Sequence, residues 1–273
     1  MLVSIIIPSK SGNPDVERLM QSIRAQNLPF DHEIIKITGV TPSGRARNHG
    51  AQQSSGTILV FLDDDIDFGH NDVIKNIVAP LNDESIGLSG VSQKIPEDSN
   101  SFQKRCAEQI QHTEHPVVKK LTEVGMVGGA CCATRKEMFD SLGGFNEKLQ
   151  RGVDVEFSHR VKKNNCRVVL VPKTWIYHPA PDNFRHFIRL HFRNGRATAY
   201  ADRNYPELNY DVGTDHLIYS LEKRNFSFRI IRFLKNILMA ILHLHFLSLT
   251  AIIVYSSGYF WENIFPKKQT HVQ

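Results

Sequence analysis

The sequence predicts an α/β fold in which a mostly parallel sheet is flanked by helices. The first 62 residues alternate between apolar β-branched segments and amphipathic segments, in the order strand, helix, strand, helix, strand, which is typical of a parallel, doubly wound sheet. The chain has 273 residues, of which 41% are hydrophobic and 22% charged. That composition excludes a disordered or collagen-like chain, and the length suffices for one large core or two small ones.

The N-terminal elements follow from local patterns. Residues 2–8 form a β-branched run that ends at a proline, as in a strand buried on both faces. We expect a helix next, with Pro14 in its first turn, where proline is tolerated. Residues 32–38 and 57–62 predict the second and third strands, separated by a short helix over 44–54. The third strand is wholly apolar apart from its first residue and runs directly into three aspartates.

The following residues continue the alternation with one polar interruption. Residues 94–123 are polar and irregular, and we expect a histidine-bearing helix between Pro96 and Pro116. The pattern predicts further strands over 86–92, 125–134, 167–171 and 175–178, and further helices over 72–81, 136–142, 154–164 and 184–200.

The C-terminal third differs in kind. Between Asn236 and Trp261 there is no Asp, Glu, Lys or Arg over 26 residues, a length of roughly 39 Å if the segment is one helix. Basic residues flank this run on both sides: Lys223, Arg224, Arg229, Arg232 and Lys235 before it, and Lys267 and Lys268 after it. Such length and flanks predict a segment that spans a membrane or lies in its interface. His243 and His245 within the run weaken the case for spanning, and a soluble core helix remains the alternative.

Charge and cysteine content limit the partners and the compartment. Residues 1–180 carry 21 basic and 21 acidic side chains, whereas residues 181–273 carry 12 and 7 and hold the whole excess of +5. A nucleic-acid-binding protein is more often basic along its main face, so we expect no nucleic-acid partner. The four cysteines, Cys106, Cys131, Cys132 and Cys166, show no metal-knuckle or CxxC spacing, which favours a reducing, cytosolic environment. The N-terminus lacks the features of a signal peptide.

Three adjacent carboxylates provide the strongest functional signal. Asp63, Asp64 and Asp65 follow an apolar strand, at the edge of the sheet where open α/β folds bind ligands. Repulsion between the three side chains is costly unless solvent, a cation or an arginine offsets it. A divalent cation with oxygen ligands is the natural partner, and Mg²⁺ often shares one or two carboxylates with substrate phosphates. The alternative is an acidic surface turn.

Other polar residues complete a candidate site. Arg47, just upstream of the aspartates, offers fixed positive charge to a diphosphate. Asp154 falls at a predicted helix start, where the helix dipole favours the ionised form that a general base needs, although it could simply cap the helix. Glu156 lies about 200° around the same helix, so only one of the two can face a given cleft. His178 ends a strand and could complete a metal site.

The order of several short blocks resembles family 2 glycosyltransferases of the GT-A fold. The blocks are Val3–Pro8, Ala46–Ala51, Phe61–Asp65, Gly143–Glu147, Asp154–Arg160 and Tyr177-His178. The resemblance covers roughly residues 1–200, and it implies a GT-A catalytic domain over 1–205, with a donor half over 1–93 and an acceptor half over 94–205. Residues 206–273 would form a C-terminal helical region that contains the apolar segment 236–261.

The resemblance also implies roles for single residues. Asp63 and Asp65 match the Asp-x-Asp motif that binds Mg²⁺ or Mn²⁺, and His178 would be a further ligand of the metal or of the diphosphate. Asp154 would be the catalytic base of an inverting transfer. The expected donor-binding residues are Pro8, Ser9, Lys10, Arg47, Asp63 and Asp64.

The expected reaction moves a sugar from a nucleotide-diphospho-sugar, with a UDP-sugar as the expected donor, to a hydroxyl of a glycan or lipid-linked acceptor at the membrane. The charge bias around the apolar segment places the enzyme on the cytoplasmic face. Two departures concern specificity: Val153 stands where many relatives have glutamate, and residues 37–39 lack the acidic residue that often reads the base. The alternatives are a nucleotidyltransferase, for which Pro8–Gly12 is a poor phosphate loop, and a non-catalytic membrane-bound scaffold.

Overall fold

The computed structural model describes residues 1–10, 13–110, 113–208, 210–212, 221–223 and 226–266. Contacts divide the chain into two compact units. The first unit comprises residues 1–98, 112–179 and 212–221, and the second comprises residues 99–111, 180–211 and 222–273. This division groups the helix that begins at Phe184 with the C-terminal helices, whereas the sequence pattern groups it with the first 205 residues. The domain boundary at residue 205 therefore stays a prediction.

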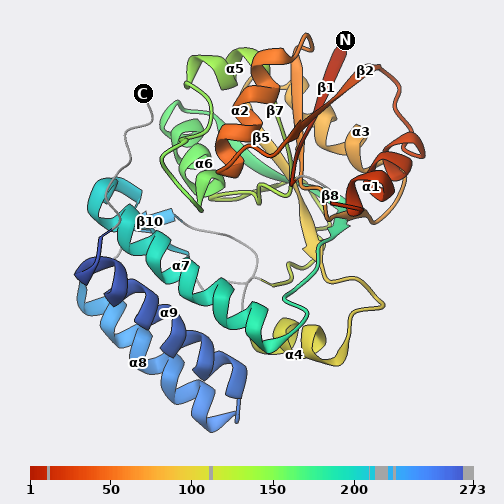
Figure 1. The fold of residues 1–273 in the computed structure, drawn as a ribbon. Helices are drawn as coiled ribbons and strands as arrows, with labels where there is room; N and C mark the ends of the chain where they lie inside the picture. The colour runs from red at the N-terminus through yellow and green to blue at the C-terminus, as the bar shows by residue number, and fades with distance from the viewer. Residues whose placement is uncertain (11–12, 111–112, 209, 213–220, 224–225, 267–273) are drawn as a thin grey trace. The chain divides into compact units, whose positions relative to one another are not determined.

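A mixed eight-stranded sheet forms the centre of the first unit among the described residues (Figure 1). Its strands are β1 (Leu2–Ser9), β2 (Asp31–Thr38), β3 (Ile58–Leu62), β4 (Asp67–Phe68), β5 (Ile86–Lys94), β6 (Thr122–Glu123), β7 (Cys131–Arg135) and β8 (Arg167–Tyr177). The order is β2-β1-β3-β7-β5-β8-β4, with β6 paired to β8. β1 is parallel to β2 and β3, and β5 is parallel to β8, whereas β7 runs antiparallel between β3 and β5. The predicted α/β class is confirmed, with a sheet that is mixed because of β7 and the short strands β4 and β6.

Helices cover this sheet and bury their apolar faces on it. They are α1 (Asp15–Arg24), α2 (Ser43–Gln53), α3 (Val73–Val78) with the 3₁₀ turn η1 (Ala79–Asn82), α5 (Lys136–Ser141) and α6 (Val153–Lys163). Helix α1 shows the logic: Val16, Leu19 and Ile23 recur at helical spacing and are buried, so one stripe faces the core. All five residues of β3 are buried, which places the residues that follow it at a rigid edge.

Several predicted boundaries differ from the observed ones. The predicted glycine-rich strand over 125–134 is reduced to β7, and residues 125–130 form a loop beside it. Two short strands predicted over 167–171 and 175–178 are one continuous strand, β8, which accommodates Lys173 at a φ of 51°. The helix between Pro96 and Pro116 is α4 (Ser101–Gln109), and it contains no histidine. The two differences in the strands arise because pairing with neighbouring strands overrides local propensity.

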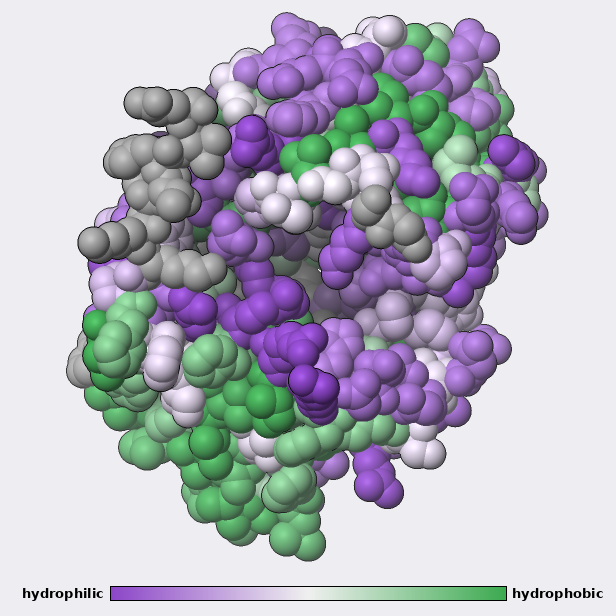
Figure 2. Space-filling model, in the orientation of Figure 1, coloured by the Kyte–Doolittle hydropathy of each residue, from purple (hydrophilic) through white to green (hydrophobic). Residues whose placement is uncertain are grey.

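The second unit is helical. Its elements are α4, α7 (Phe184–Asn204), the 3₁₀ turn η2 (Pro206–Leu208), α8 (Phe226–Leu242) and α9 (Phe246–Ile264), and β9 (Tyr210–Val212) pairs with β10 (Leu221–Lys223) in a separate ladder. Helices α7 and α9 pack closely because glycines meet at their crossing: a Cβ at Gly195 would lie 1.9 Å from the Tyr255 carbonyl oxygen, and one at Gly258 would lie 2.2 Å from that of Phe192. Hydrophobic side chains gather over α8 and α9 on the face shown in Figure 2.

The apolar segment 236–261 is divided between two helices, so the length of about 39 Å that one continuous helix would have does not apply. Helix α8 ends at Leu242, Leu244 adopts a φ of 53°, and α9 begins at Phe246. Across the described residues, no helix is both long and apolar enough to cross a bilayer. The flanking residues Arg224, Lys267 and Lys268 lie outside the described residues.

Candidate active site

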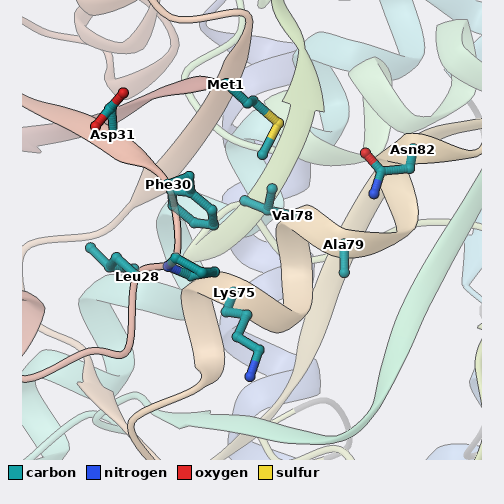
Figure 3. Close-up of a pocket in the computed structure, with 9 residues that line it drawn as sticks. Met1, Leu28, Phe30, Asp31, Lys75, Val78, Ala79 and Asn82 are labelled. Atoms are coloured by element: carbon teal, nitrogen blue, oxygen red, sulfur yellow. The ribbon is translucent and has the colours of Figure 1, made fainter.

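One pocket of about 680 Å³ lies at the amino ends of β1 and β2, away from the predicted site. Met1, Phe30, Asp31, Lys75 and Val78 are among its lining residues, and Figure 3 shows Met1, Phe30 and Val78 turned toward the same space. The aspartates follow β3 at the opposite, carboxyl edge of the parallel strands. None of the predicted site residues lines this pocket.

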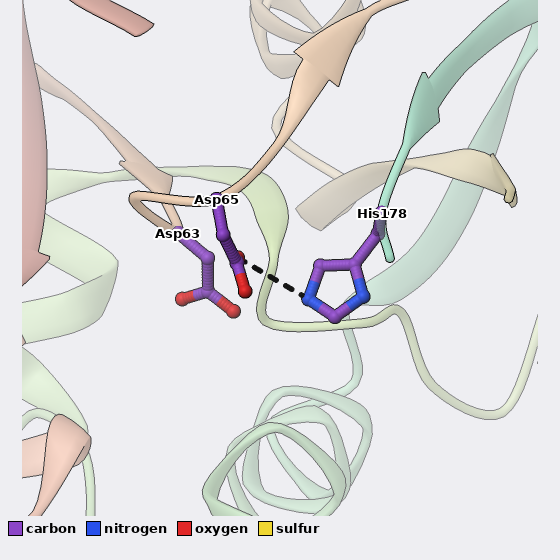
Figure 4. A group of neighbouring side chains, drawn as sticks. All are labelled: Asp63, Asp65 and His178. Carbon is purple, nitrogen blue, oxygen red and sulfur yellow. Dashed lines mark ion pairs between the residues drawn. The ribbon is translucent and has the colours of Figure 1, made fainter. Parts of the chain in front are cut away.

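The carboxyl edge of the sheet brings two of the three aspartates to a histidine (Figure 4). Asp63, Asp65 and His178 each offer a ligand atom, and these atoms all lie within 4.8 Å of one another. His178 Nε2 is 3.5 Å from Asp65 Oδ1. Strand pairing explains the approach of residues so distant in sequence, because β4, just after the aspartates, is antiparallel to the end of β8.

The electrostatics of this cluster favour a cation. Burial raises the pKa of Asp65 above its ordinary value, and repulsion from Asp63 and Asp64 adds to this effect, while His178 acts in the opposite direction. A divalent ion would remove both costs, since it replaces lost solvation and neutralises the neighbouring carboxylates. Two carboxylates and one imidazole are a donor set that suits Mn²⁺, and the carboxylates also suit Mg²⁺. The residues therefore fit the metal that the resemblance implies.

Arg47 is buried against the cluster rather than exposed to solvent. Its Nη2 donates to Asp63 Oδ1 at 2.5 Å and to the carbonyl oxygen of Gly129 at 2.9 Å. Only 4% of its side chain is exposed, compared with 30% for Asp63. The guanidinium carbon also lies 5.6 Å from the centre of the Phe145 ring. The positive charge of Arg47 thus neutralises Asp63, and its second hydrogen bond holds the loop that contains Gly129.

Asp154 reaches the same loop from the other side. Its Oδ2 accepts a hydrogen bond from the Gly129 N–H at 3.1 Å, and its Oδ1 accepts one from the Val155 N–H at 3.0 Å. Gly129 therefore links Arg47 through its carbonyl oxygen to Asp154 through its N–H. The half-buried Asp154 lies in the first turn of α6, where the helix dipole favours a carboxylate.

Glu156, the other carboxylate of this helix, is committed to a structural pair. Its two oxygens accept from Arg160 at 2.5 and 2.6 Å, and only 9% of its side chain is exposed. Arg160 also donates to the carbonyl oxygens of Leu142 and Gly144. Asp154 is consequently the carboxylate of α6 that remains available for proton transfer.

The predicted donor-binding residues of the first strand lie at the same edge of the sheet. Pro8 and Ser9 end β1, and Lys10 follows it with an exposed side chain. Asn13 connects this segment to the aspartates: its N–H donates to the Lys10 carbonyl oxygen at 3.3 Å, and its Nδ2 donates to Asp64 Oδ2 at 2.7 Å. Asp64 is thereby turned toward the first loop.

The sequence did not single out three residues that support the site: Gly129, Asn48 and Arg160. For Gly129 the available sequence signal is that it belongs to a Gly-Gly pair. A Cβ at Gly129 would lie 3.4 Å from Nη1 and Nη2 of Arg47 and from Cβ of Asp154. Asn48 exchanges hydrogen bonds with the Phe145 backbone, which Arg160 supports through Gly144. These bonds join three of the sequence blocks into one hydrogen-bonded unit behind the site.

The adjacent cysteines of β7 play no nucleophilic part. Both side chains are buried, and burial raises the pKa of the Cys132 thiol to about 12. The pKa of Cys131 is likewise raised well above its ordinary value, chiefly by burial. Both thiols are therefore neutral and act as small apolar side chains under the site.

Comparison with known proteins identifies the family. The model of a family described as "Glycosyltransferase like family 2" matches residues 4–197, a range that contains every predicted site residue. The chain belongs to family 2 of the glycosyltransferases. This glycosyltransferase is 25% identical over 191 residues to the O-antigen biosynthesis protein RfbC of Myxococcus xanthus, an alignment that covers 64% of the chain and 14% of RfbC. The chain thus spans about a seventh of the length of that relative.

Solved structures support the GT-A fold of this glycosyltransferase. The mannosyltransferase PcManGT from Pyrobaculum calidifontis, in complex with GDP-Man and Mn²⁺, matches with a TM-score of 0.54 at 18% identity, covering 97% of this chain and 76% of PcManGT. TarS of S. aureus matches with a TM-score of 0.51 at 13% identity, covering 96% of this chain and 55% of TarS. At such identities the likeness concerns the fold.

Proposed function

We propose that this family 2 glycosyltransferase transfers a sugar from a nucleoside-diphosphate sugar to a hydroxyl group, with inversion at the anomeric carbon. The observation that supports this is the placement of Asp63, Asp65 and His178 within 4.8 Å of one another, one loop away from Asp154. A diphosphate leaving group needs a cation, and an attacking hydroxyl needs a base. The two requirements are met by different residues on either side of Gly129.

Each residue has a distinct task in this proposal. Asp63, Asp65 and His178 would hold Mg²⁺ or Mn²⁺, which, when bound, would offset the charge that develops on the departing nucleoside diphosphate. Asp154 takes the proton of the acceptor hydroxyl while its oxygen attacks the anomeric carbon. The bond between that carbon and the diphosphate oxygen breaks in the same step, so a single displacement inverts the configuration. A positioned base of this kind contributes typically about 10²–10⁴-fold in rate.

The donor is proposed to be a UDP-sugar, bound by the residues Pro8, Ser9, Lys10, Arg47, Asp63 and Asp64. The PcManGT complex holds GDP-Man with Mn²⁺, which supports the general class of donor, a nucleotide sugar with a divalent metal. The end of β2, Ile37-Thr38, followed by Gly39, offers no acidic side chain to the nucleotide base.

The acceptor is proposed to be a glycan or a lipid-linked glycan at the cytoplasmic face of a membrane. The name of RfbC associates that protein with O-antigen biosynthesis, and the C-terminal helices of this chain are unusually apolar. The acceptor proposal is independent of the donor chemistry, which rests on residues before 180.

A thermal-shift screen of nucleotide sugars, with and without Mn²⁺, tests the donor proposal. Because a ligand that binds only the native state raises its stability by mass action, the true donor should raise Tm only when the metal is present. Product analysis then decides the reaction: release of a nucleoside diphosphate supports glycosyl transfer, whereas release of inorganic diphosphate contradicts it. Absence of metal-dependent binding for every nucleotide sugar would favour a non-catalytic scaffold.

A further inference from the structure

Helices α8 and α9 expose an unusually large apolar surface. Side chains with 52–68% of their area exposed follow the outer faces of both helices: Ile231, Leu234, Leu238, Ile241 and Leu242 on α8, and Phe246, Ile253, Phe260 and Ile264 on α9. Between the helices, Leu244 is 87% exposed. Figure 2 shows mostly hydrophobic residues over α8 and α9, with a few residues of intermediate hydropathy among them. An exposed patch of this kind marks an interaction site.

The apolar face of α9 is not the one it uses for packing within its own unit. Phe246, Ile253 and Phe260 recur every seven residues and therefore share one side of the helix. Gly258 and Glu262 belong to the other side, where Gly258 closes on α7 and Glu262 accepts from Arg196 at 2.6 Å. Because α7 already holds that side, the outer stripe remains available to a partner.

The charges on α8 and along the exposed stripe of α7 are basic, whereas Asp202 near the end of α7 accepts a hydrogen bond from the Tyr259 hydroxyl of α9 at 2.9 Å. Residues 226–261 include no Asp or Glu, and Glu262 is only 3% exposed and is paired with Arg196. On α7, Arg185, Arg189 and Arg193 are exposed and recur every fourth residue, so they form one stripe along the helix. Figure 2 shows strongly hydrophilic atoms along α7 beside the hydrophobic area.

We infer that α7, α8 and α9 form a docking surface for an anionic lipid bilayer, with α8 and α9 lying in the interface rather than crossing it. An interfacial helix buries its apolar side by about 5–10 Å at the headgroup boundary, while basic side chains contact anionic headgroups. The break at Leu244 supports this arrangement, because it divides the apolar segment into two helices that can both lie flat. A second copy of the chain is a poorer occupant, since it would bring the same positive charge to the contact.

Vesicle co-sedimentation of the full chain tests this inference. Wild type should sediment with vesicles of phosphatidylcholine and phosphatidylglycerol more strongly than with phosphatidylcholine alone, and salt should weaken the difference. Changing Arg185, Arg189 and Arg193 to glutamine should lower the partition coefficient on anionic vesicles by about 100-fold, since each basic residue near such a surface contributes about five-fold. That variant should bind neutral vesicles as wild type does.

A second variant separates apolar insertion from charge attraction. Leu234→Glu with Leu238→Glu places carboxylates on the outer face of α8 and should abolish sedimentation with both kinds of vesicle. Gln52→Glu with Gln53→Glu is the matched control, because it adds the same charge at exposed positions of α2 in the other unit and should leave binding nearly unchanged. Circular dichroism checks that each variant is folded.

Two results would overturn the inference. If the wild-type protein remains in the supernatant with both kinds of vesicle, α7, α8 and α9 do not form a membrane-docking surface. Likewise, a wild-type dimer in light scattering that the leucine variant dissociates, without vesicle binding, would assign the apolar face to a second copy. Neither result bears on the proposed donor chemistry, because metal-dependent binding of a nucleotide sugar is measured without vesicles.

Discussion

Replacing Arg47 by methionine should destabilise the protein in a way that Mn²⁺ partly reverses. The substitution keeps a long apolar stem but removes the guanidinium that neutralises Asp63 and donates to the Gly129 carbonyl oxygen. Removal of one partner of a fully buried ion pair costs about 3–5 kcal/mol. Because 30% of the Asp63 side chain is exposed, we expect a smaller loss of about 2–3 kcal/mol, which corresponds to a decrease in Tm of about 5–10 °C.

The metal dependence distinguishes this explanation from a general packing defect. In wild type Arg47 competes with a cation for Asp63, whereas in Arg47→Met the metal becomes the sole counter-charge of that carboxylate. We therefore expect Mn²⁺ to bind about ten-fold more tightly to the variant, which would add about 1.4 kcal/mol to the stabilisation that saturating Mn²⁺ gives wild type. Differential scanning fluorimetry with a titration of Mn²⁺, and with EDTA as the metal-free reference, measures both quantities.

Arg160→Met is the matched control. Arg160 also pairs with a buried carboxylate and donates to backbone carbonyl oxygens, but its partner Glu156 does not belong to the Asp63, Asp65 and His178 group. This variant should lose stability to a similar extent and gain from Mn²⁺ only what wild type gains. If Mn²⁺ raises the Tm of Arg47→Met by no more than that of Arg160→Met, the assignment of Arg47 as the counter-charge of a metal ligand is refuted.

Three further predictions concern the site and the helical unit. Because the pKa of Asp65 is raised in the folded state, the native state binds this proton more tightly than the unfolded state does, and the stability from this group is present at low pH and lost as pH rises through the folded pKa. Asp65→Asn should therefore raise the Tm of the metal-free protein at pH 7, and calorimetry should find that its Mn²⁺-dependent donor binding is abolished. An unchanged donor affinity would remove Asp65 from the metal site. Asp154→Asn should keep donor affinity and lower kcat by about 10²-fold or more, whereas Glu156→Gln should lower Tm but leave the folded fraction active; the reverse pattern in steady-state kinetics would move the base to Glu156. Gly195→Ala should destabilise the helical unit by about 1–3 kcal/mol or more through overpacking against the Tyr255 carbonyl, as measured by urea denaturation, and a change below 0.5 kcal/mol would show that the α7–α9 contact is loose.

The features that could be predicted from the sequence are those that depend on local pattern. The buried strand β3 and the aspartates after it follow from one apolar run and its abrupt end. The position of His178 near the aspartates could be expected because this residue ends a predicted strand, as the aspartates do. The order of such blocks led to the family resemblance, which the family match confirms, and the GT-A fold that it implies agrees with the solved structures.

Features that depend on distant contacts could not be predicted in this way. The burial of Arg47 requires the Gly129 carbonyl, 82 residues away, whereas a short basic cluster alone is typical of a solvated helix face. The antiparallel insertion of β7 between β3 and β5 is decided by strand pairing rather than by the composition of β7. The break between α8 and α9 has no glycine or proline to mark it, since Leu244 itself takes the left-handed conformation.

The two-sided contact of Gly129 has a consequence for the evolution and redesign of this protein. Donor and acceptor specificity are commonly treated as separable, so that one loop could be exchanged while the other chemistry is retained. Here a single peptide loop supports both Arg47, the counter-charge of the proposed metal ligand Asp63, and the proposed base Asp154. We therefore expect any insertion near residues 125–130 to disturb both proposed roles together. Segments such as 94–123, which carry none of these contacts among the described residues, are the better place to graft a new acceptor preference.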